Sequence, residues 1–453
     1  MPTVRALRPP AVVLGLVALG AVIVTGWWVY QVSHQPPVGP GAWWGGAGRL
    51  CGLVAGYLGV VQVVLAARVP WFEHTVAMRP ARAIHVGTGM AFLTLTAAHA
   101  GLAVEANAAS IGSPFVAALI GVSVDLPYVW LAVLGLVLLL VTAISSVPAL
   151  RRTMPYGWWH LQHLAVYPAI VVGFAHQLYG PDLTASPARV LWTGMHLGAL
   201  GTLGWYRVLA PARLTLRHQF AVAAVEPEAP GVVSILVSGQ GLDSVGARSG
   251  QYFRLRALRG PMWWHSHPFS LSEAPGSDRL RFTVRAVGDY SEALAGLTPG
   301  RWLLLSGPYG ALTARAQRRR RVLLLAGGLG IAPLRALLED VGAGPGGDSA
   351  THPDSPAITL LYRTERVEQI VFRKEIDELA SRRGAVVHYL TGPTPTGEQD
   401  DPLAAQRLTA LVPDLAAHDA YVCGPPGMVA ATVRALRAAG LDRHHIHAET
   451  SAF

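Results

Sequence analysis

Two histidines within one apolar segment are the first residues that could do chemistry. His85 and His99 lie fourteen positions apart in the segment 81–104. An α-helix rises about 21 Å over fourteen residues and returns to almost the same face. Because an imidazole inside a membrane is costly without a partner, we expect each ring to hold a ligand. The spacing therefore predicts two ligand sites at two depths of a membrane.

A second apolar segment, 158–179, supplies matching imidazoles. Paired imidazoles are typical axial ligands of an iron porphyrin, and these ligands set its redox potential. We therefore expect two b-type hemes, one above the other. The predicted iron ligands are His85, His99, His163 and His176. An ideal helix would turn His163 and His176 about 140° apart, so a bulge, a tilt or different heme planes would be needed.

Three further polar residues in the apolar half have two interpretations each. His160 is a rival inner ligand by geometry, and His196 lies in a later apolar segment. A lone histidine of this kind is more often a buried, hydrogen-bonded side chain, and we favour that interpretation for both. Arg49 could steer an anion or an oxygen species near the outer surface. An arginine whose head group reaches the membrane interface is the favoured interpretation.

The histidines belong to a membrane half that we expect to comprise residues 1–210. The mean hydropathy of the chain is +0.36, and its apolar residues are concentrated in this half. Each apolar stretch is close to the roughly 20 residues that cross a bilayer. The six predicted spans are 11–30, 50–67, 83–104, 127–147, 158–179 and 190–209.

Arginines gather in alternate loops between these spans. They are Arg5, Arg8, Arg68, Arg79, Arg82, Arg151, Arg152, Arg213 and Arg217. The positive-inside rule then places both termini in the cytoplasm. His85 and His163 would lie on the inner side, and His99 and His176 on the outer side. We therefore expect a multi-pass protein of the cell membrane whose second half is cytoplasmic.

Composition excludes several other classes of protein. The formal net charge is +9, but basic and aromatic residues are not interleaved as in nucleic-acid-binding proteins. Cys51 and Cys423 lie in different halves of the chain, so we expect no disulfide. Without a CxxC motif, an iron–sulfur centre or a structural zinc site is not expected either.

The pattern changes after residue 210. Short apolar runs separated by Gly, Pro and Ser predict a small antiparallel β-barrel over residues 211–315. Strand and helix patterns then alternate over residues 316–453, which predicts a doubly wound α/β domain. We therefore expect a multidomain membrane protein: a six-helix transmembrane heme bundle, a β-barrel and an α/β domain.

A glycine-rich turn after the first strand of the α/β domain favours a dinucleotide. Gly327, Gly328 and Gly330 precede a helix, whose N-terminus favours a pyrophosphate. A tight strand-to-helix turn is the alternative. The segment 423–427, CGPPG, follows another strand, and ligands bind at the carboxyl ends of such strands.

The next strand ends in Tyr362 and Arg363, where an adenosine ribose would lie. An acidic residue there favours NAD, whereas an arginine can hold a 2′-phosphate. Arg363 and Arg366 therefore favour NADPH over NADH. A solvated arginine at the end of a strand is an equally plausible interpretation.

Taken together, the motifs of the second half resemble the ferredoxin-reductase-type flavin and nicotinamide domains. HPFSLS at 267–272 resembles the flavin motif, and VRAVGDYS at 284–291 the segment that binds the FAD pyrophosphate. LAGGLGIAPLRALL and YVCGPPGMV resemble the two nicotinamide motifs, and the tail ETSAF at 449–453 the segment whose aromatic residue stacks on the flavin.

The resemblance implies FAD and nicotinamide sites built from these motifs. The implied cofactor-binding residues are His267, Pro268, Phe269, Ser270, Leu271, Ser272, Val284, Arg285, Ser291, Gly327, Gly328, Gly330, Ile331, Ala332, Pro333, Tyr362, Arg363, Cys423, Gly424, Pro425 and Phe453. Among them Ser270, Cys423 and Phe453 would lie against the reacting ring. Hydride transfer needs no general acid or base, so none is assigned.

The membrane half resembles the six-helix domain of NADPH oxidases and ferric reductases. In that family two histidines with thirteen residues between them lie on the third helix, and two with twelve between them on the fifth. The pairs His85/His99 and His163/His176 match both spacings. Val86 departs from the family, in which a basic residue is common at that position.

The resemblance implies transmembrane electron transfer. NADPH would reduce FAD in the cytoplasm, and electrons would pass through the inner and outer hemes to oxygen, giving superoxide, or to ferric iron. An electron-relay subunit that serves an exported partner protein is the alternative. A flavin reductase with a plain membrane anchor is a third hypothesis, and it predicts no heme absorbance.

Overall fold

A computed structural model describes residues 9–70, 72, 78–184, 186–257, 266–341, 357–395, 397 and 400–451. The chain divides into two compact units, Met1–Val208 and Leu209–Phe453, each with its own packing. The predicted flavin-stacking residue Phe453 lies outside the described residues.

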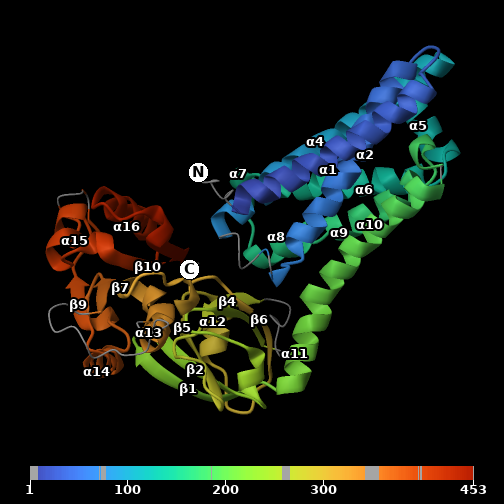
Figure 1. Cartoon of the computed structure of the whole chain (residues 1–453). Coiled ribbons are helices and arrows are strands. Elements are labelled where there is room, and N and C mark those ends of the chain that lie inside the picture. The colour runs from blue at the N-terminus through green and yellow to red at the C-terminus, as the bar shows by residue number, and fades with distance from the viewer. Residues whose placement is uncertain are drawn as a thin grey trace. The chain divides into compact units, whose positions relative to one another are not determined.

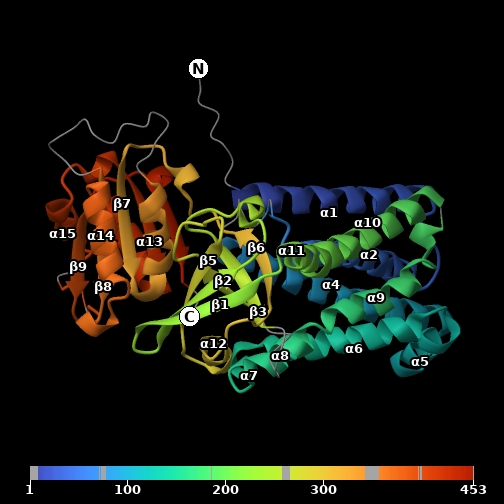
Figure 2. The same cartoon turned by 90° about the horizontal axis from the view of Figure 1, so that it is seen from below.

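The first unit is built from helices (Figures 1 and 2). In chain order they are α1 Pro9–His34, α2 Ala42–Ala66, α4 Met78–Ile111, α5 Phe115–Asp125, α6 Val129–Ser146, α7 Pro148–Arg151, α8 Tyr156–His163, α9 Val166–Gln177 and α10 Ser186–Gly204. A π-helical turn, η2 Trp205–Leu209, follows α10. The stretch 105–125, which lies between the third and fourth predicted spans, is therefore largely helical, in the end of α4 and in α5.

Four helices of the described residues are long and apolar enough to cross a membrane. They are Pro10–His34, Ala42–Ala66, Ala81–Ile111 and Val129–Ser146. The predicted fifth span is divided into α8 and α9, and the predicted sixth lies in α10, whose apolar character is lowered by Arg189 and His196. The structure thus confirms a helical membrane half but not the count of six spans.

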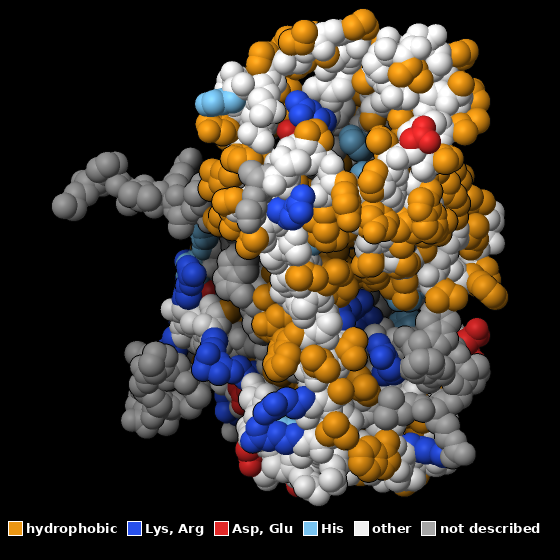
Figure 3. Space-filling view, turned by 90° about the vertical axis from the view of Figure 1, so that its right-hand side faces the viewer, with side chains coloured by type: hydrophobic (Ala, Val, Ile, Leu, Met, Phe, Trp, Pro, Cys, Tyr) orange, Lys and Arg blue, Asp and Glu red, His pale blue; other side chains and the backbone are white. Residues whose placement is uncertain are grey.

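The surface of this unit is apolar. Leu16, Val22 and Ile23 of α1 are 56–66 % exposed, and Val141 and Ile144 of α6 are also exposed. Figure 3 shows hydrophobic side chains covering a broad area of the helices. Exposed apolar side chains on this scale are expected where lipid, not water, is the solvent.

The second unit begins with α11 Ala210–His218 and continues into two antiparallel sheets. The first sheet has the order β1-β2-β5, and the second the order β4-β3-β6. Their strands are β1 Ala221–Ala229, β2 Val232–Ser238, β3 Tyr252–Ala257, β4 His267–Ser270, β5 Arg279–Arg285 and β6 Leu303–Tyr309. Bridges from Ala221 to Trp302 and from Leu271 to Phe282 join both edges of the sheets. The structure thus shows two bridged antiparallel sheets, while the closed barrel stays a prediction.

A five-stranded parallel sheet follows, with the order β11-β10-β7-β8-β9. Its strands are β7 Arg321–Gly327, β8 Ile358–Thr364, β9 Val386–Thr391, β10 His418–Gly424 and β11 Ile446–Thr450, and its main helices are α13 Ile331–Asp340, α14 Arg373–Arg383, α15 Ala405–Leu411 and α16 Pro426–Ala438. One core joins the sheet to α13 and α14, and a second joins its other face to α15 and α16. The doubly wound prediction is confirmed, although β11 and α15 were not predicted.

An ion cluster joins the barrel to the α/β domain. Arg281 of β5 is 6 % exposed, and it donates to Glu228 of β1 at 2.5 Å and to Glu375 of α14 at 2.8 and 2.9 Å. Arg335 of α13 also pairs with Glu375, at 2.9 Å. Because a buried cation is costly without a partner, the barrel and the α/β domain hold each other in a fixed arrangement.

Candidate functional site

The predicted inner pair of histidines is brought together by α4 and α8. The ring centres of His85 and His163 lie 6.3 Å apart, with an angle of 61° between the ring planes. Trp159, one helical turn before His163, stacks on its ring at 5.0 Å. The Ser146 hydroxyl lies 3.4 Å from Nδ1 of His163. The structure thus brings together the two rings that were predicted as the inner pair.

The predicted outer pair is brought together by α4 and α9. The ring centres of His99 and His176 lie 6.1 Å apart, with 30° between the ring planes. Nδ1 of His99 lies 2.8 Å from the carbonyl oxygen of Gly48. That carbonyl can only accept, so Nδ1 carries the proton and Nε2 keeps a free lone pair.

The chain breaks between α8 and α9, so the angle of about 140° that an ideal helix would place between His163 and His176 does not apply. Pro168 has no N–H for the carbonyl of Leu164, four residues earlier, and its ring crowds that carbonyl. The chain winds more tightly there, with the Tyr167 N–H bonded to the Leu164 oxygen at 3.1 Å. Pro168 was a visible signal in the sequence for this break, and it was missed.

Both ring separations fit a metal between the rings. Two imidazoles that bind one metal from opposite sides bring their ring centres to about 6.3 Å apart, from bonds of about 2.0 Å and about 1.15 Å within each ring. The residues present therefore fit two bis-histidine hemes. No cluster of three or more His, Cys, Asp or Glu able to hold a bare metal ion occurs among the described residues.

His196 and Arg49 both have partners within this unit. His196 is 4 % exposed, and its Nδ1 lies 2.9 Å from the Trp192 carbonyl oxygen, in keeping with the buried interpretation. Arg49 pairs with Asp182 at 3.5 Å, and the Asp182 side chain is 7 % exposed. This ion pair was not anticipated, since Asp182 lies far from Arg49 in the sequence.

In the second unit, the two glycine-containing loops meet at the carboxyl edge of the parallel sheet. The turn at 328–330 follows β7, and CGPPG ends β10, the neighbouring strand. A Cβ on Gly330 would lie 2.2 Å from the Cys423 carbonyl oxygen, so only glycine permits this approach. Since β7 and β10 flank the point where the strand order reverses, the loops line the usual nucleotide site.

The tail and the barrel also reach this edge. The Ser451 N–H donates to the Gly424 carbonyl at 2.9 Å, and Glu449 accepts from the Ala311 N–H at 3.4 Å. Tyr252, which pairs with Ser270 of β4, lies beside Gly310, in the loop that also contains Ala311. Tyr252 and Glu449 were not assigned from the sequence. The GPYG motif at 307–310 was the available signal.

Cys423, predicted to lie by the reacting ring, is 4 % exposed. Burial, with a smaller effect from the Glu449 carboxylate, raises the pKa of its thiol well above the usual range. The side chain is therefore a neutral thiol at physiological pH. It can pack against a bound ring but cannot act as a thiolate.

The flavin motif at 267–272 includes strand β4, which has partly exposed side chains. His267 and Ser270 are half-buried, and Tyr290 stacks on His267 at 4.5 Å. Pro268 is also half-buried. Four predicted residues have buried side chains and could bind a cofactor only through backbone groups: Phe269, Leu271, Ser272 and Val284.

The pyrophosphate motif is shaped by its own hydrogen bonds. The Ser291 hydroxyl accepts from the N–H groups of Val287 and Gly288 at 3.0 and 3.2 Å. Ser291 therefore holds the turn that begins α12, Asp289–Ala295. Arg285, at the end of β5, makes no hydrogen bond or ion pair with another described residue and suits an anion.

The predicted adenosine end differs from expectation. Ile331, Ala332, Pro333 and Tyr362 are buried. The Arg363 guanidinium donates to three carbonyls, of Thr364, Leu390 and Pro393. It therefore binds the ends of β8 and β9 to each other. Arg366 is exposed just beyond and remains the better cation for a phosphate.

Comparison with known proteins now assigns the class. Residues 51–174 match the family described as "ferric reductase like transmembrane component". Residues 324–434 match the family described as "oxidoreductase NAD-binding domain". The protein is therefore a membrane oxidoreductase in which a ferric-reductase-like component is joined to a reductase module. The family resemblance drawn from the sequence is confirmed.

Relatives match mainly the second half. The reductase component of propane 2-monooxygenase from Gordonia sp. (strain TY-5) is 29 % identical, over 47 % of this chain and 61 % of that protein. The 2-halobenzoate 1,2-dioxygenase electron transfer component of Burkholderia cepacia is 32 % identical, over 40 % and 52 %. The flavohemoprotein of Bordetella pertussis is 30 % identical, over 59 % and 66 %. The chain thus spans between half and two thirds of the length of these relatives.

Among solved structures, the flavohem-like FAD/NAD binding domain of nitric oxide dioxygenase from Vibrio cholerae is 22 % identical, with a TM-score of 0.42, over 51 % of this chain and 97 % of that one. Flavohemoglobin from Malassezia yamatoensis is 16 % identical, with a TM-score of 0.43, over 89 % and 97 %. Together the sequence comparisons support an FAD- and NAD(P)-binding reductase module.

Proposed function

We propose that this protein carries electrons from cytoplasmic NADPH through FAD and two b-type hemes to an acceptor on the outer side of the membrane. The observation that supports this most directly is the presence of two imidazole pairs, with ring centres 6.3 and 6.1 Å apart, in a ferric-reductase-like component. Two separate pairs on one bundle give electrons two stations at different depths.

The residues of the chain divide this task. His85, His99, His163 and His176 would hold the irons. Ser270, Arg285 and the half-buried face of β4 would orient the flavin, while the loops at 328–330 and 423–427 would hold the nicotinamide nucleotide. When bound, FAD accepts a hydride and can release its electrons singly to hemes.

The acceptor is oxygen, giving superoxide, or chelated ferric iron. The described outer residues contain no cluster of ligands for a bare metal ion, so iron would arrive within a chelate. Superoxide formation and ferric-chelate reduction, measured on the same membranes with NADPH, distinguish the two. An electron-relay subunit would instead be reduced by NADPH but turn over slowly with both acceptors.

A visible spectrum of the purified protein before and after NADPH tests the proposal. We expect a Soret band, a flavin contribution and reduced b-type bands after NADPH addition. Replacing His99 by alanine should remove about half of the heme absorbance. A yellow protein that binds flavin but no porphyrin would refute the proposal.

A further inference from the structure

One ring of the outer pair, that of His99, is oriented by the backbone of a neighbouring helix. Gly48 and Gly52 of α2 lie one turn apart and face α4. The Gly48 carbonyl accepts the hydrogen bond from His99 Nδ1 at 2.8 Å. A Cβ on Gly52 would lie 2.7 Å from the same Nδ1 and 2.9 Å from Cε1. The two glycines thus limit the space on one side of the His99 ring.

The hydrogen bond to Gly48 and the close approach of Gly52 leave the His99 ring little room to move. Contacts below about 3.0 Å between a Cβ and a ring atom require one of them to move. The His99 ring could move only by giving up its hydrogen bond to Gly48 and its alignment with His176. Glycine at position 52 is therefore a requirement of the ring position, as well as of close helix packing.

The inner pair lacks this arrangement. In the inner pair, Nδ1 of His163 lies 3.4 Å from the hydroxyl of Ser146. A hydroxyl can rotate, whereas a helix carbonyl is fixed by its backbone. The inner rings are also turned 61° from each other, against 30° for the outer rings.

From these contacts we propose that Gly48 and Gly52 are positioning residues for the outer heme ligand His99, and that they make the two heme sites electronically different. The inference rests on the proposed function, because it requires hemes between the imidazole pairs. Near-parallel imidazoles act on the same iron d orbital, whereas strongly crossed ones act on different orbitals. With hemes bound, the outer site would be the rhombic low-spin site and the inner one the more anisotropic.

Electron paramagnetic resonance of the oxidised full-length protein tests the first part without any variant. We expect two low-spin ferric signals of different anisotropy, and His99→Ala should remove the rhombic one. A single signal type for both hemes would overturn the inference. Absence of heme from the wild-type protein would refute the proposed function itself, which distinguishes the two failures.

The Gly52→Ala variant tests the second part. We expect loss or a shift of the rhombic signal, a heme-to-protein ratio lowered up to twofold, and unchanged flavin content. Two alanine variants on α2 serve as controls. On Gly46 a Cβ would meet Pro37 at an ordinary 3.6 Å, and on Gly59 it would meet Phe92 at a tight 3.3 Å.

The controls separate positioning from packing. Both should keep the wild-type rhombic signal, even if Gly59→Ala lowers thermal stability. The inference is overturned if Gly52→Ala keeps both signals at wild-type positions, or if Gly59→Ala changes the outer signal to the same extent. The midpoint potential of the outer heme gives a readout that does not depend on turnover.

Discussion

At the scale of single residues, Gly330 has the most direct consequence for the nicotinamide site. Its Cα touches the end of β10 so closely that an added Cβ would lie 2.2 Å from the Cys423 oxygen. Overpacking of this kind typically costs about 1–3 kcal/mol. We expect Gly330→Ala to raise the KM for NADPH by about tenfold or more, because the two loops must separate.

Steady-state reduction of a soluble dye measures this effect. Gly427→Ala is the matched control, since no atom lies within 4 Å of a Cβ at that position in the opposite loop. If Gly330→Ala and Gly427→Ala had the same KM, the contact between the loops would not shape the nucleotide site.

Nucleotide preference is also decided by single residues. Arg363 was predicted to hold a 2′-phosphate, but its guanidinium is committed to backbone carbonyls. The exposed Arg366 is the better candidate, while the Glu365 carboxylate, held by Thr394 at 2.9 Å, suits a ribose hydroxyl. A charged hydrogen bond is worth about 1.5–3 kcal/mol. We expect Arg366→Ser to lower kcat/KM for NADPH about 10- to 100-fold, with little change for NADH.

The ratio of kcat/KM for the two nucleotides is the measurement, and Glu365→Ser is the companion variant. Glu365→Ser should affect NADH more than NADPH. An unchanged NADPH preference in Arg366→Ser would remove Arg366 from the site.

At the scale of elements, the sequence predicted the long apolar helices, but not α5 or α15, nor where the fifth predicted span breaks. The spacing of His163 and His176 was incompatible with one straight helix. The structure places the break at Leu164–Ala165, before Pro168. Local chemistry was therefore sufficient to predict it. In contrast, the Arg49–Asp182 ion pair joins distant segments, and no local pattern contains that information.

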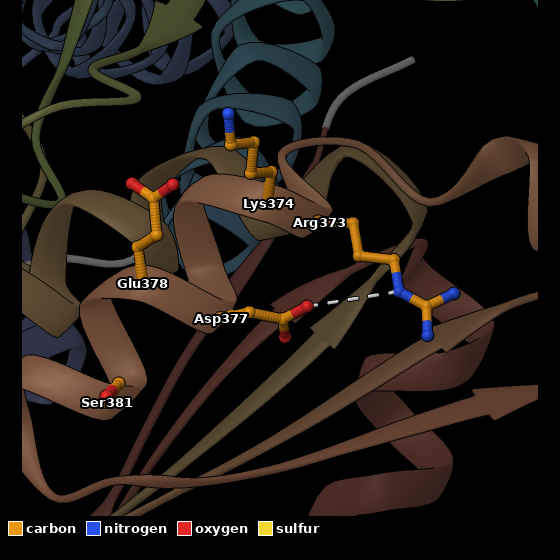
Figure 4. Close-up of a pocket in the computed structure, with 5 residues that line it drawn as sticks. All are labelled: Arg373, Lys374, Asp377, Glu378 and Ser381. Carbon is orange, nitrogen blue, oxygen red and sulfur yellow. Dashed lines mark ion pairs between the residues drawn. The ribbon is translucent and has the colours of Figure 1, made fainter.

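The ion cluster around Arg281 is another feature that only the folded chain could show. Replacing Arg281 by methionine would leave Glu228 without its buried cation and Glu375 with Arg335 alone, at a cost of about 3 kcal/mol. For a unit of this size we expect the temperature of flavin release to fall by roughly 10 °C. Arg373→Met is the control, because the Arg373–Asp377 pair spans 4.0 Å on the exposed face of α14 (Figure 4).

An exposed pair of this kind contributes at most about 1 kcal/mol. Arg373 and Asp377 line a shallow surface of α14, and the other side chains of this surface belong to the same helix: Lys374, Glu378 and Ser381. Equal losses of stability in Arg281→Met and Arg373→Met would show that the buried cluster has no special role.

The same cluster predicts a pH dependence. Burial alone would raise the pKa of Glu375, but the guanidinium groups of Arg281 and Arg335 outweigh it and hold the pKa below its ordinary value of 4.5. The ionised carboxylate therefore stabilises the fold above about pH 4.5, and this contribution is lost as the pH falls through the lowered pKa. The difference in melting temperature between wild type and Arg281→Met should shrink as the pH falls from about 6 to about 3.

At the scale of the whole molecule, hydropathy and strand periodicity were enough to divide the chain. The predicted boundary at residue 210 lies two residues beyond the observed limit, Val208. The alternation of strand and helix also predicted a parallel sheet, but not the order of its strands. The sequence did not show which side chains are exposed at each cofactor face, because strand periodicity alone does not reveal that Phe269 packs in the barrel core or that the buried Ser272 hydroxyl accepts from Thr283.

The division into two units predicts that the reductase half works alone. Helix α11 belongs to this half, since the Thr215 hydroxyl accepts from the Leu305 N–H at 3.2 Å and His218 Nδ1 lies 2.6 Å from the Gln240 oxygen. A fragment comprising Leu209–Phe453 should therefore fold, bind FAD and reduce a soluble dye with NADPH, but show no Soret band.

A shorter fragment that begins at Ala221, without α11, is the control. It exposes the β6 edge that α11 covers, so it should release flavin at a lower temperature. If the longer fragment binds no flavin while the full-length protein does, the flavin site requires the membrane unit. If the longer fragment reduces the dye without containing heme, the nicotinamide chemistry belongs to residues 209–453. Every later electron step then belongs to the paired imidazoles.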